Sequence, residues 1–170
     1  MGITIHFEGS LRSVDSLSML LQEARAFANE QAWPYVEIPN EMRSLARVRD
    51  EADWDYAGLT SGFEISPHKN AEPLRLEFDY DGYIQEYIKT QFAPLEIHLS
   101  VVNLLRKLEP YFASLDVVDE SDFWETNDIV LLRQSFDRFF EVVEDEKAKN
   151  PRLTGPYRLE NGRIADFLED

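Results

Sequence analysis

Acidic residues follow a regular spacing in segment 116–128, and that spacing could serve chemistry. They stand at every third position, with Glu120 among them: Asp116, Asp119, Asp122, Glu125 and Asp128. In a 3₁₀ turn, residues three apart lie on the same side, so their carboxylates could offer oxygen ligands to Mg²⁺ or Ca²⁺. Because no glycine supplies the sharp turn of a calcium loop, we expect a hydrated loop without a bound metal, whose last acids stabilise the start of a helix.

Histidines are the other residues of chemical interest, and the chain has three: His6, His68 and His98. His6 falls on the polar side of an alternating segment, beside Glu8, whereas His98 lies on a largely apolar helix. Either of these two could form an acid–base or metal site with a carboxylate of segment 116–128. A hydrogen-bonded structural histidine is the commoner role, so this pairing is the alternative hypothesis.

The familiar motifs of catalysis are missing from the sequence. It contains no cysteine, which excludes disulfides, thiol catalysis and thiolate metal sites. It has no glycine-rich dinucleotide or phosphate loop, no HExxH and no EF-hand loop. The stretch 58–62, Gly-Leu-Thr-Ser-Gly, has the wrong spacing for a nucleophile elbow. No cofactor is therefore predicted, and a binding protein is favoured over an enzyme.

Charge is the most unusual property of the chain. Seventeen Lys and Arg stand against 33 Asp and Glu, which gives a formal net charge of −16. A field of this sign repels nucleic-acid phosphates and anionic lipid, and it favours a basic partner. Residues 114–146 hold eleven acids against two bases, which leaves −9, more than half of the total.

Two aromatic residues, Phe123 and Trp124, lie inside this acidic stretch. Aromatic anchors ringed by carboxylates are typical of a surface that binds a basic protein. The predicted partner-binding residues are Asp119, Glu120, Asp122, Phe123, Trp124 and Glu125. If both aromatic rings fold into the core instead, the acids form an ordinary solvated face.

The leading functional hypothesis is a non-enzymatic, acidic interaction domain of the immunity or inhibitor type, which covers a basic protein partner. The alternative is a small enzyme or ligand-binding protein with a histidine–carboxylate site. Because the negative charge repels phosphates and anionic lipid, we expect no binding to nucleic acid or to a membrane surface. No stretch approaches the roughly 18 apolar residues of a membrane span either. The start of the chain lacks the basic leader and long apolar run of a signal peptide, so a cytoplasmic location is expected.

Hydrophobic periodicity predicts the elements that must position these residues. Alternation predicts strands over 3–7, 35–38, 59–65, 74–80 and 115–118, and helical spacing predicts long helices over 14–31, 94–110 and 129–143. We expect Thr126 or Asn127 to cap the last helix and residues 39–57 to be irregular. Residues 83–92 fit a strand or a helix, and the strand is favoured because Asp81-Gly82 is a hairpin turn signal.

Clustered strands flanked by helices predict a single α+β domain over residues 1–170. It should contain a mostly antiparallel sheet of about five to six strands, with three long helices packed on it. The core should combine the apolar stripes of the helices with the alternating face Leu74, Leu76 and Phe78. Residues 151–170 are too apolar for a free tail, and we expect them to dock on the domain as a C-terminal extension.

Overall fold

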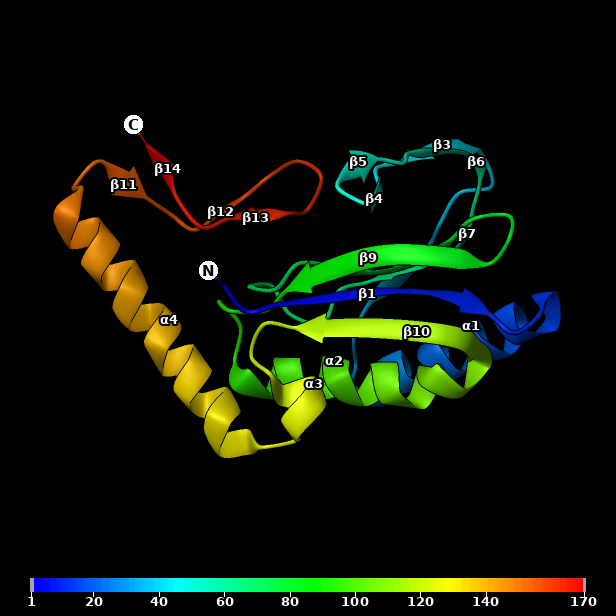
Figure 1. Ribbon diagram of the computed structural model, residues 1–170, viewed down its shortest axis with the longest axis horizontal. Coiled ribbons are helices and arrows are strands. Elements are labelled where there is room, and N and C mark those ends of the chain that lie inside the picture. The colour runs from blue at the N-terminus through cyan, green and yellow to red at the C-terminus, as the bar shows by residue number, and fades with distance from the viewer. Residues whose placement is uncertain (1, 170) are drawn as a thin grey trace.

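Three long strands form the sheet around which the chain is organised. In the computed structural model, which describes residues 2–169, β1 (Thr4–Leu11) lies between β9 (Tyr83–Lys89) and β10 (Phe112–Asp119), antiparallel to both. Figure 1 shows α1 and α2 on one side of this sheet and the region of β3 to β6 on the other. The strand favoured for residues 83–92 is therefore present as β9.

Alternation along β1 explains why one face of this sheet is buried. Ile5 and Phe7 are at most 3% exposed, whereas His6 is exposed and Glu8 is half-buried. Because successive side chains of a strand point to opposite faces, one face joins the core and the other carries polar groups.

Two helices, α1 (Val14–Glu30) and α2 (Leu95–Leu108), cover the apolar face. The side chain of Ser13 caps α1 by accepting a hydrogen bond from the Ser16 N–H at 3.3 Å, as its place before the apolar stripe predicts. The 3₁₀ turn η1 (Glu109–Tyr111) follows α2. Both helices therefore begin and end close to where the sequence places them.

The core is built from helix stripes and strand faces. Each helix buries side chains at three- and four-residue steps: Leu20, Ala24, Phe27 and Ala28 in α1, and Val101, Leu104, Leu105 and Leu108 in α2. Leu74, Leu76 and Phe78 belong to the same cluster and are at most 1% exposed. This part of the predicted core is confirmed.

A second antiparallel sheet contains β2 (Tyr35–Glu37), β7 (Ser61–Ile65) and β8 (Leu74–Phe78). β8 leads into β9 through a tight turn, yet within residues 2–169 no backbone ladder joins the two strands. The prediction of one sheet of five to six strands is therefore wrong, although the α+β class and the antiparallel pairing are confirmed. The described residues form several small sheets, two of three strands and the others of two.

Residues 42–59 form two nested hairpins. The paired strands are β3 (Met42–Leu45) with β6 (Tyr56–Leu59) and β4 (Val48–Arg49) with β5 (Ala52–Asp53). The prediction of irregular structure over 39–57 is wrong for this part. Asp50 and Glu51 turn the inner hairpin with φ of 51° and 63°, a conformation that glycine or asparagine usually signals.

The third long helix, α4 (Ile129–Lys149), lies apart from the sheet and contacts α2 near its own N-terminal half. Asp128 caps it by accepting hydrogen bonds from two N–H groups of the first turn, so the predicted caps Thr126 and Asn127 are wrong. Those two residues end the short helix α3 (Phe123–Thr126) instead. None of the helices within residues 2–169 is long and apolar enough to cross a bilayer.

The C-terminal segment forms two short hairpins. The paired strands are β11 (Leu153–Thr154) with β14 (Leu168–Glu169) and β12 (Tyr157–Arg158) with β13 (Ile164–Ala165). Lys89 donates from Nζ to the Ile164 carbonyl at 2.8 Å and to Asp166 at 2.9 Å, and Ile164 is 7% exposed. These bonds hold the β12–β13 hairpin, with its C-terminal turn at residues 159–163, against the end of β9.

Candidate functional site

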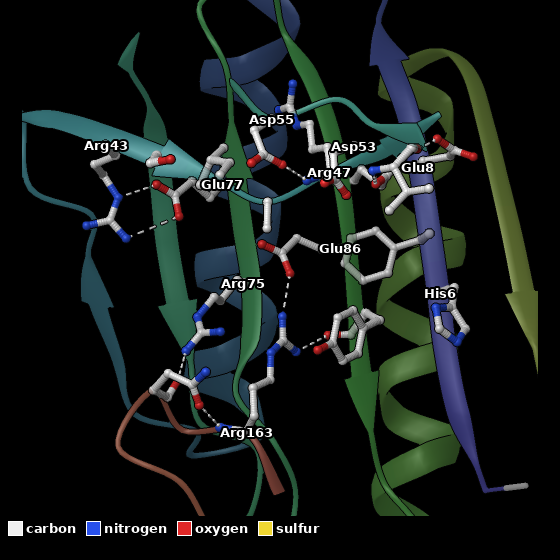
Figure 2. Close-up of a pocket in the computed structure, with 18 of the residues that line it drawn as sticks. His6, Glu8, Arg43, Arg47, Asp53, Asp55, Arg75, Glu77, Glu86 and Arg163 are labelled. Atoms are coloured by element: carbon white, nitrogen blue, oxygen red, sulfur yellow. Dashed lines mark hydrogen bonds and ion pairs between the residues drawn. The ribbon is translucent and has the colours of Figure 1, made fainter. Parts of the chain in front are cut away.

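A cavity of about 940 Å³ opens between the polar face of the β10–β1–β9 sheet, the nested hairpins and the C-terminal turn. Figure 2 shows His6 and Glu8 of β1 on one side of this space, with Arg43 and Arg47 of the hairpins and Arg163 of the C-terminal turn around it. Segments far apart in the sequence meet here, so the cavity depends on the tertiary fold.

Each of the four arginines in the wall is paired with a carboxylate. The pairs are Arg43–Glu77 at 2.5 Å, Arg47–Asp79 at 2.8 Å, Arg75–Glu64 at 2.8 Å, and Arg163 with Glu86 at 2.9 Å and Glu72 at 3.2 Å. Glu72, Glu77 and Asp79 are buried. Because a buried carboxylate is costly without a cation, these arginines are committed to neutralising the protein's own acids.

Side chains of the same network take the place of β8 along the edge of β9. Arg47 donates to the Tyr83 carbonyl at 3.3 Å, Arg163 donates to the Tyr87 carbonyl at 2.7 Å, and the Glu72 carboxylate accepts from the Lys89 N–H at 3.0 Å. These bonds satisfy backbone groups that would otherwise pair with a neighbouring strand. They explain why the sheet divides between β8 and β9.

Arg47 is enclosed by aromatic rings as well as by Asp79. The residue is 3% exposed, and its guanidinium carbon lies 5.0 to 5.7 Å from the ring centres of Trp54, Tyr56 and Tyr83. Its Nε has no hydrogen-bond acceptor among residues 2–169. A buried N–H group without an acceptor is unfavourable, and the negative faces of the three rings offset part of this cost because they attract the guanidinium cation.

Four carboxylates of the wall have no Lys or Arg within ion-pair distance in the described part of the chain: Glu8, Asp53, Asp55 and Asp116. Glu8 and Asp116 stand directly opposite each other in the register of β1 and β10. Hydrogen bonds from Tyr83 and Gln85, with a smaller effect of the Arg49 charge, lower the pKa of Glu8. Like charges opposite each other on neighbouring strands repel, so this face would gain from a bound cation.

Glu86 of β9 also lies in the wall, next to Arg163 (Figure 2). Burial raises the pKa of Glu86 above its ordinary value, and the Arg163 guanidinium offsets part of that effect. The charged form of this carboxylate therefore depends on Arg163.

A second polar cluster, His98 with Asp119 and Ser121, is sealed in the core. The Nε2 atom of His98 lies 3.0 Å from Asp119 Oδ2 and 3.1 Å from Ser121 Oγ, and Nδ1 lies 2.8 Å from the Thr90 hydroxyl. All four residues are at most 5% exposed. A catalytic triad places its serine and its acid on opposite nitrogens of the imidazole, whereas here both share Nε2. The cluster therefore ties α2 to the end of β10.

The six predicted partner-binding residues divide between core and surface. Asp119 and Phe123 are each 5% exposed, and Trp124 is half-buried with its ring 5.2 Å from the guanidinium of Arg106. The exposed members are Glu120, Asp122 and Glu125. In this conformation a partner can reach Glu120, Asp122 and Glu125, and the exposed part of Trp124.

His6 is the histidine that reaches the cavity. Its side chain is 50% exposed, its Nε2 lies 3.8 Å from Glu120 Oε1, and its ring centre lies 5.6 Å from that of Tyr87. His68 accepts a hydrogen bond from the Asn70 N–H in a separate loop. Within residues 2–169 no group of three or more His, Asp or Glu is placed to hold a metal ion.

Sequence reasoning did not identify the arginines of the cavity as part of a site. Arg43, Arg47 and Arg49 lie close together in an acidic chain, and this was the one local signal. Arg75 and Arg163 stand alone in the sequence, and only the fold brings them to the same wall.

Comparisons with known proteins show no relationship for this chain. No family model matches it, and searches of curated proteins and of solved structures find no match either.

Proposed function

We propose that the cavity holds basic side chains of a protein partner, and that the chain acts by binding, in the manner of an immunity or inhibitor protein. The observation that carries this proposal is the division of charge in the wall. All four arginines are occupied by the protein's own carboxylates, whereas Glu8, Asp53, Asp55 and Asp116 have no Lys or Arg within ion-pair distance in the described chain.

A cation near Glu8 and Asp116 would relieve the repulsion between them. The net charge of −16 acts at longer range, because it attracts a basic protein and speeds the encounter. The exposed acids Glu120 and Asp122 extend this negative surface past the end of β10. Trp124 is proposed as an aromatic contact at its border.

A titration with an oligolysine peptide tests the proposal. The double variant Glu8→Gln/Asp116→Asn should weaken binding by about tenfold or more, because it removes two of the four wall carboxylates that lack an ion-pair partner. A matched control, Asp137→Asn/Glu141→Gln, removes the same charge from exposed positions of α4 and should change the affinity by less than about threefold. Equal loss in both variants would show that net charge alone attracts the peptide and that the cavity is not the site.

An enzyme with His6 as an acid–base group is the second candidate, and the contact between His6 and Glu120 at the cavity supports it. In this second candidate the protein would modify its partner covalently, whereas in the first it would only bind the partner. Mass spectrometry of a peptide recovered after incubation separates the two proposals. An unaltered peptide supports binding alone, whereas an altered peptide whose formation stops in His6→Gln supports the enzyme.

A further inference from the structure

The two edges of the β10–β1–β9 sheet differ, because one is covered by hydrogen-bonding side chains and the other has no neighbouring strand in the described chain. The outer edge of β9 is closed by Arg47, Arg163 and Glu72, whose side chains bond to its backbone. β10 stands at the other end of the sheet, and no strand pairs with its outer side in the described chain. The protein therefore protects one edge and leaves the other open.

The register shows which backbone groups of β10 are unpaired. The Glu120 N–H donates to the Thr4 carbonyl at 3.1 Å. Because backbone groups alternate along a strand, the other even-numbered residues of β10, at 114, 116 and 118, also direct their N–H and C=O groups to β1. Leu115 and Val117 alternate with them and direct their N–H and C=O groups outward. Within residues 2–169 no backbone or side-chain group bonds to the main chain of Leu115 or Val117 on this outer side.

An open edge of this length is usually protected by lysine, proline or a bulge, because it can pair with other chains. Residues 114–118 contain neither lysine nor proline, and the bulge of β10, in which Ala113 is the extra residue between the partners of Ser10 and Leu11, lies just before this stretch. A hollow of about 340 Å³ lies beside the first half of β10, lined in part by Ala113, Leu115 and Arg106. The start of the open edge therefore borders a hollow.

We infer that the edge of β10 accepts an extended segment of the protein partner as an added antiparallel strand. The basic character of that segment rests on the proposed function, whereas the pairing rests on the edge itself. On one face its side chains would lie next to Asp116 and Val118, both of which line the cavity. On the other face they would lie next to Leu115 and Val117.

The segment should therefore alternate basic and apolar residues. Its basic side chains reach over the cavity, and its apolar side chains cover the half-buried Leu115 and the buried Val117 on the helix side. A second copy of this chain is a poor occupant of the edge, because each copy carries a charge of −16 and the paired strands would bring Asp116 of both copies to one surface.

N-methylated peptides test the inference directly. The probe is an eight-residue peptide of alternating lysine and valine, whose affinity for the full chain is measured by calorimetry. In an antiparallel pairing the valines face the helix side, so their N–H groups point to β10 and those of the lysines point away. Methylating every valine nitrogen should weaken binding by about tenfold or more, whereas methylating every lysine nitrogen should leave it nearly unchanged.

Hydrogen exchange supplies the second readout. The amides of Leu115 and Val117 should exchange more slowly when the unmethylated peptide is bound. Equal affinity of the two methylated peptides, or unchanged exchange at these amides, would overturn the inference. So would a concentration-dependent dimer that protects the same amides without peptide, because the occupant would then be a second copy.

A glutamine–valine peptide separates this inference from the proposed function. If it binds as well as the lysine–valine peptide and keeps the methylation pattern, the basic partner is wrong and the strand pairing holds. If only the lysine peptide binds and methylation of either kind has no effect, the charge proposal holds and the strand pairing is wrong.

Discussion

At the scale of single residues, His6 and His98 look alike in the sequence and differ completely in the fold. Each meets a carboxylate of segment 116–128, His6 at Glu120 and His98 at Asp119. His98 is sealed, because the ring of Phe136 lies 6.0 Å from it and the surrounding helices exclude water. The sequence was enough to select both histidines as candidates. Whether each histidine is buried depends on packing between distant helices, which local patterns do not encode.

Asp119 gives a prediction that depends on pH. Burial alone would raise the pKa of its carboxyl, but the hydrogen bond and charge of His98, with the bonds from Ser121, outweigh burial and lower it below 3.8. A lowered folded pKa contributes stability that is present above about pH 4 and is lost as the pH falls through the folded value. Asp119→Asn should cost about 1–3 kcal/mol of unfolding free energy at neutral pH.

Urea denaturation at several pH values checks this prediction. The difference between the wild type and Asp119→Asn should narrow as the pH falls below about 4. Asp122→Asn is the control, because Asp122 is exposed. A constant difference across the acid range would contradict the assigned role of the carboxylate.

Asp116 gives a second prediction at this scale, in which stability and binding change in opposite directions. It is exposed and stands opposite the charged Glu8, so Asp116→Asn should raise the free energy of unfolding by about 0.2–1 kcal/mol. The same change should weaken binding of the oligolysine peptide. Denaturation and calorimetry on one preparation measure both effects, and a loss of stability would show that Asp116 has a favourable partner.

At the scale of elements, helices and strands with clear apolar periodicity were predictable, and strands held by polar side chains were not. α1, α2 and β8 follow from their stripes, because burial of one face dictates the spacing. The nested hairpins carry Arg43 and Arg47, whose bonds to buried acids replace hydrophobic packing. Such long-range ion pairs leave no periodic pattern in the sequence.

Leu105 tests the core contributed by α2. It is 1% exposed, so Leu105→Ala should lower the free energy of unfolding by about 2–5 kcal/mol through lost burial and a residual cavity. The control is Leu131→Ala in α4, where the side chain is 40% exposed and the cost should stay below about 1 kcal/mol. Chemical denaturation measures both, and a cost below about 0.5 kcal/mol for Leu105→Ala would remove this residue from the core.

At the scale of the whole molecule, the placement of positive charge explains both the divided sheet and the acidic cavity. Of the seventeen basic residues, four arginines are drawn inward to carboxylates of β7, β8, β9 and the turn after β8. Two of them, Arg47 and Arg163, bond to the β9 backbone where a neighbouring strand would pair. Because all four are engaged with acids, the remaining acids of the wall have no arginine within ion-pair distance in the described chain. The count of charges was available from the sequence, but their distribution was not, since it requires the C-terminal turn to meet β9.

Arg163 tests this organisation, because it joins the C-terminal turn to two acids of the body. Glu72 is 1% exposed, and the side chain of Glu86 is 11% exposed. Arg163→Ala leaves both without this cation and should cost about 3–5 kcal/mol of unfolding free energy at neutral pH. Arg152→Ala is the matched control: it breaks an ion pair with Glu169 whose side chains are 71% and 52% exposed, and should cost at most about 1 kcal/mol.

The pH dependence of the Arg163→Ala variant separates a lost ion pair from lost packing. Burial already raises the pKa of Glu86, and removing the guanidinium raises it further, so this acid takes up a proton more readily in the folded variant. A raised folded pKa makes the folded state gain relative stability as the pH falls through that value. The cost of the substitution should therefore shrink between neutral pH and about pH 5. A cost that stays constant over this range would mean that Arg163 holds the C-terminal turn through its bond to the Tyr87 carbonyl and its stacking on the Tyr87 ring, and not through charge.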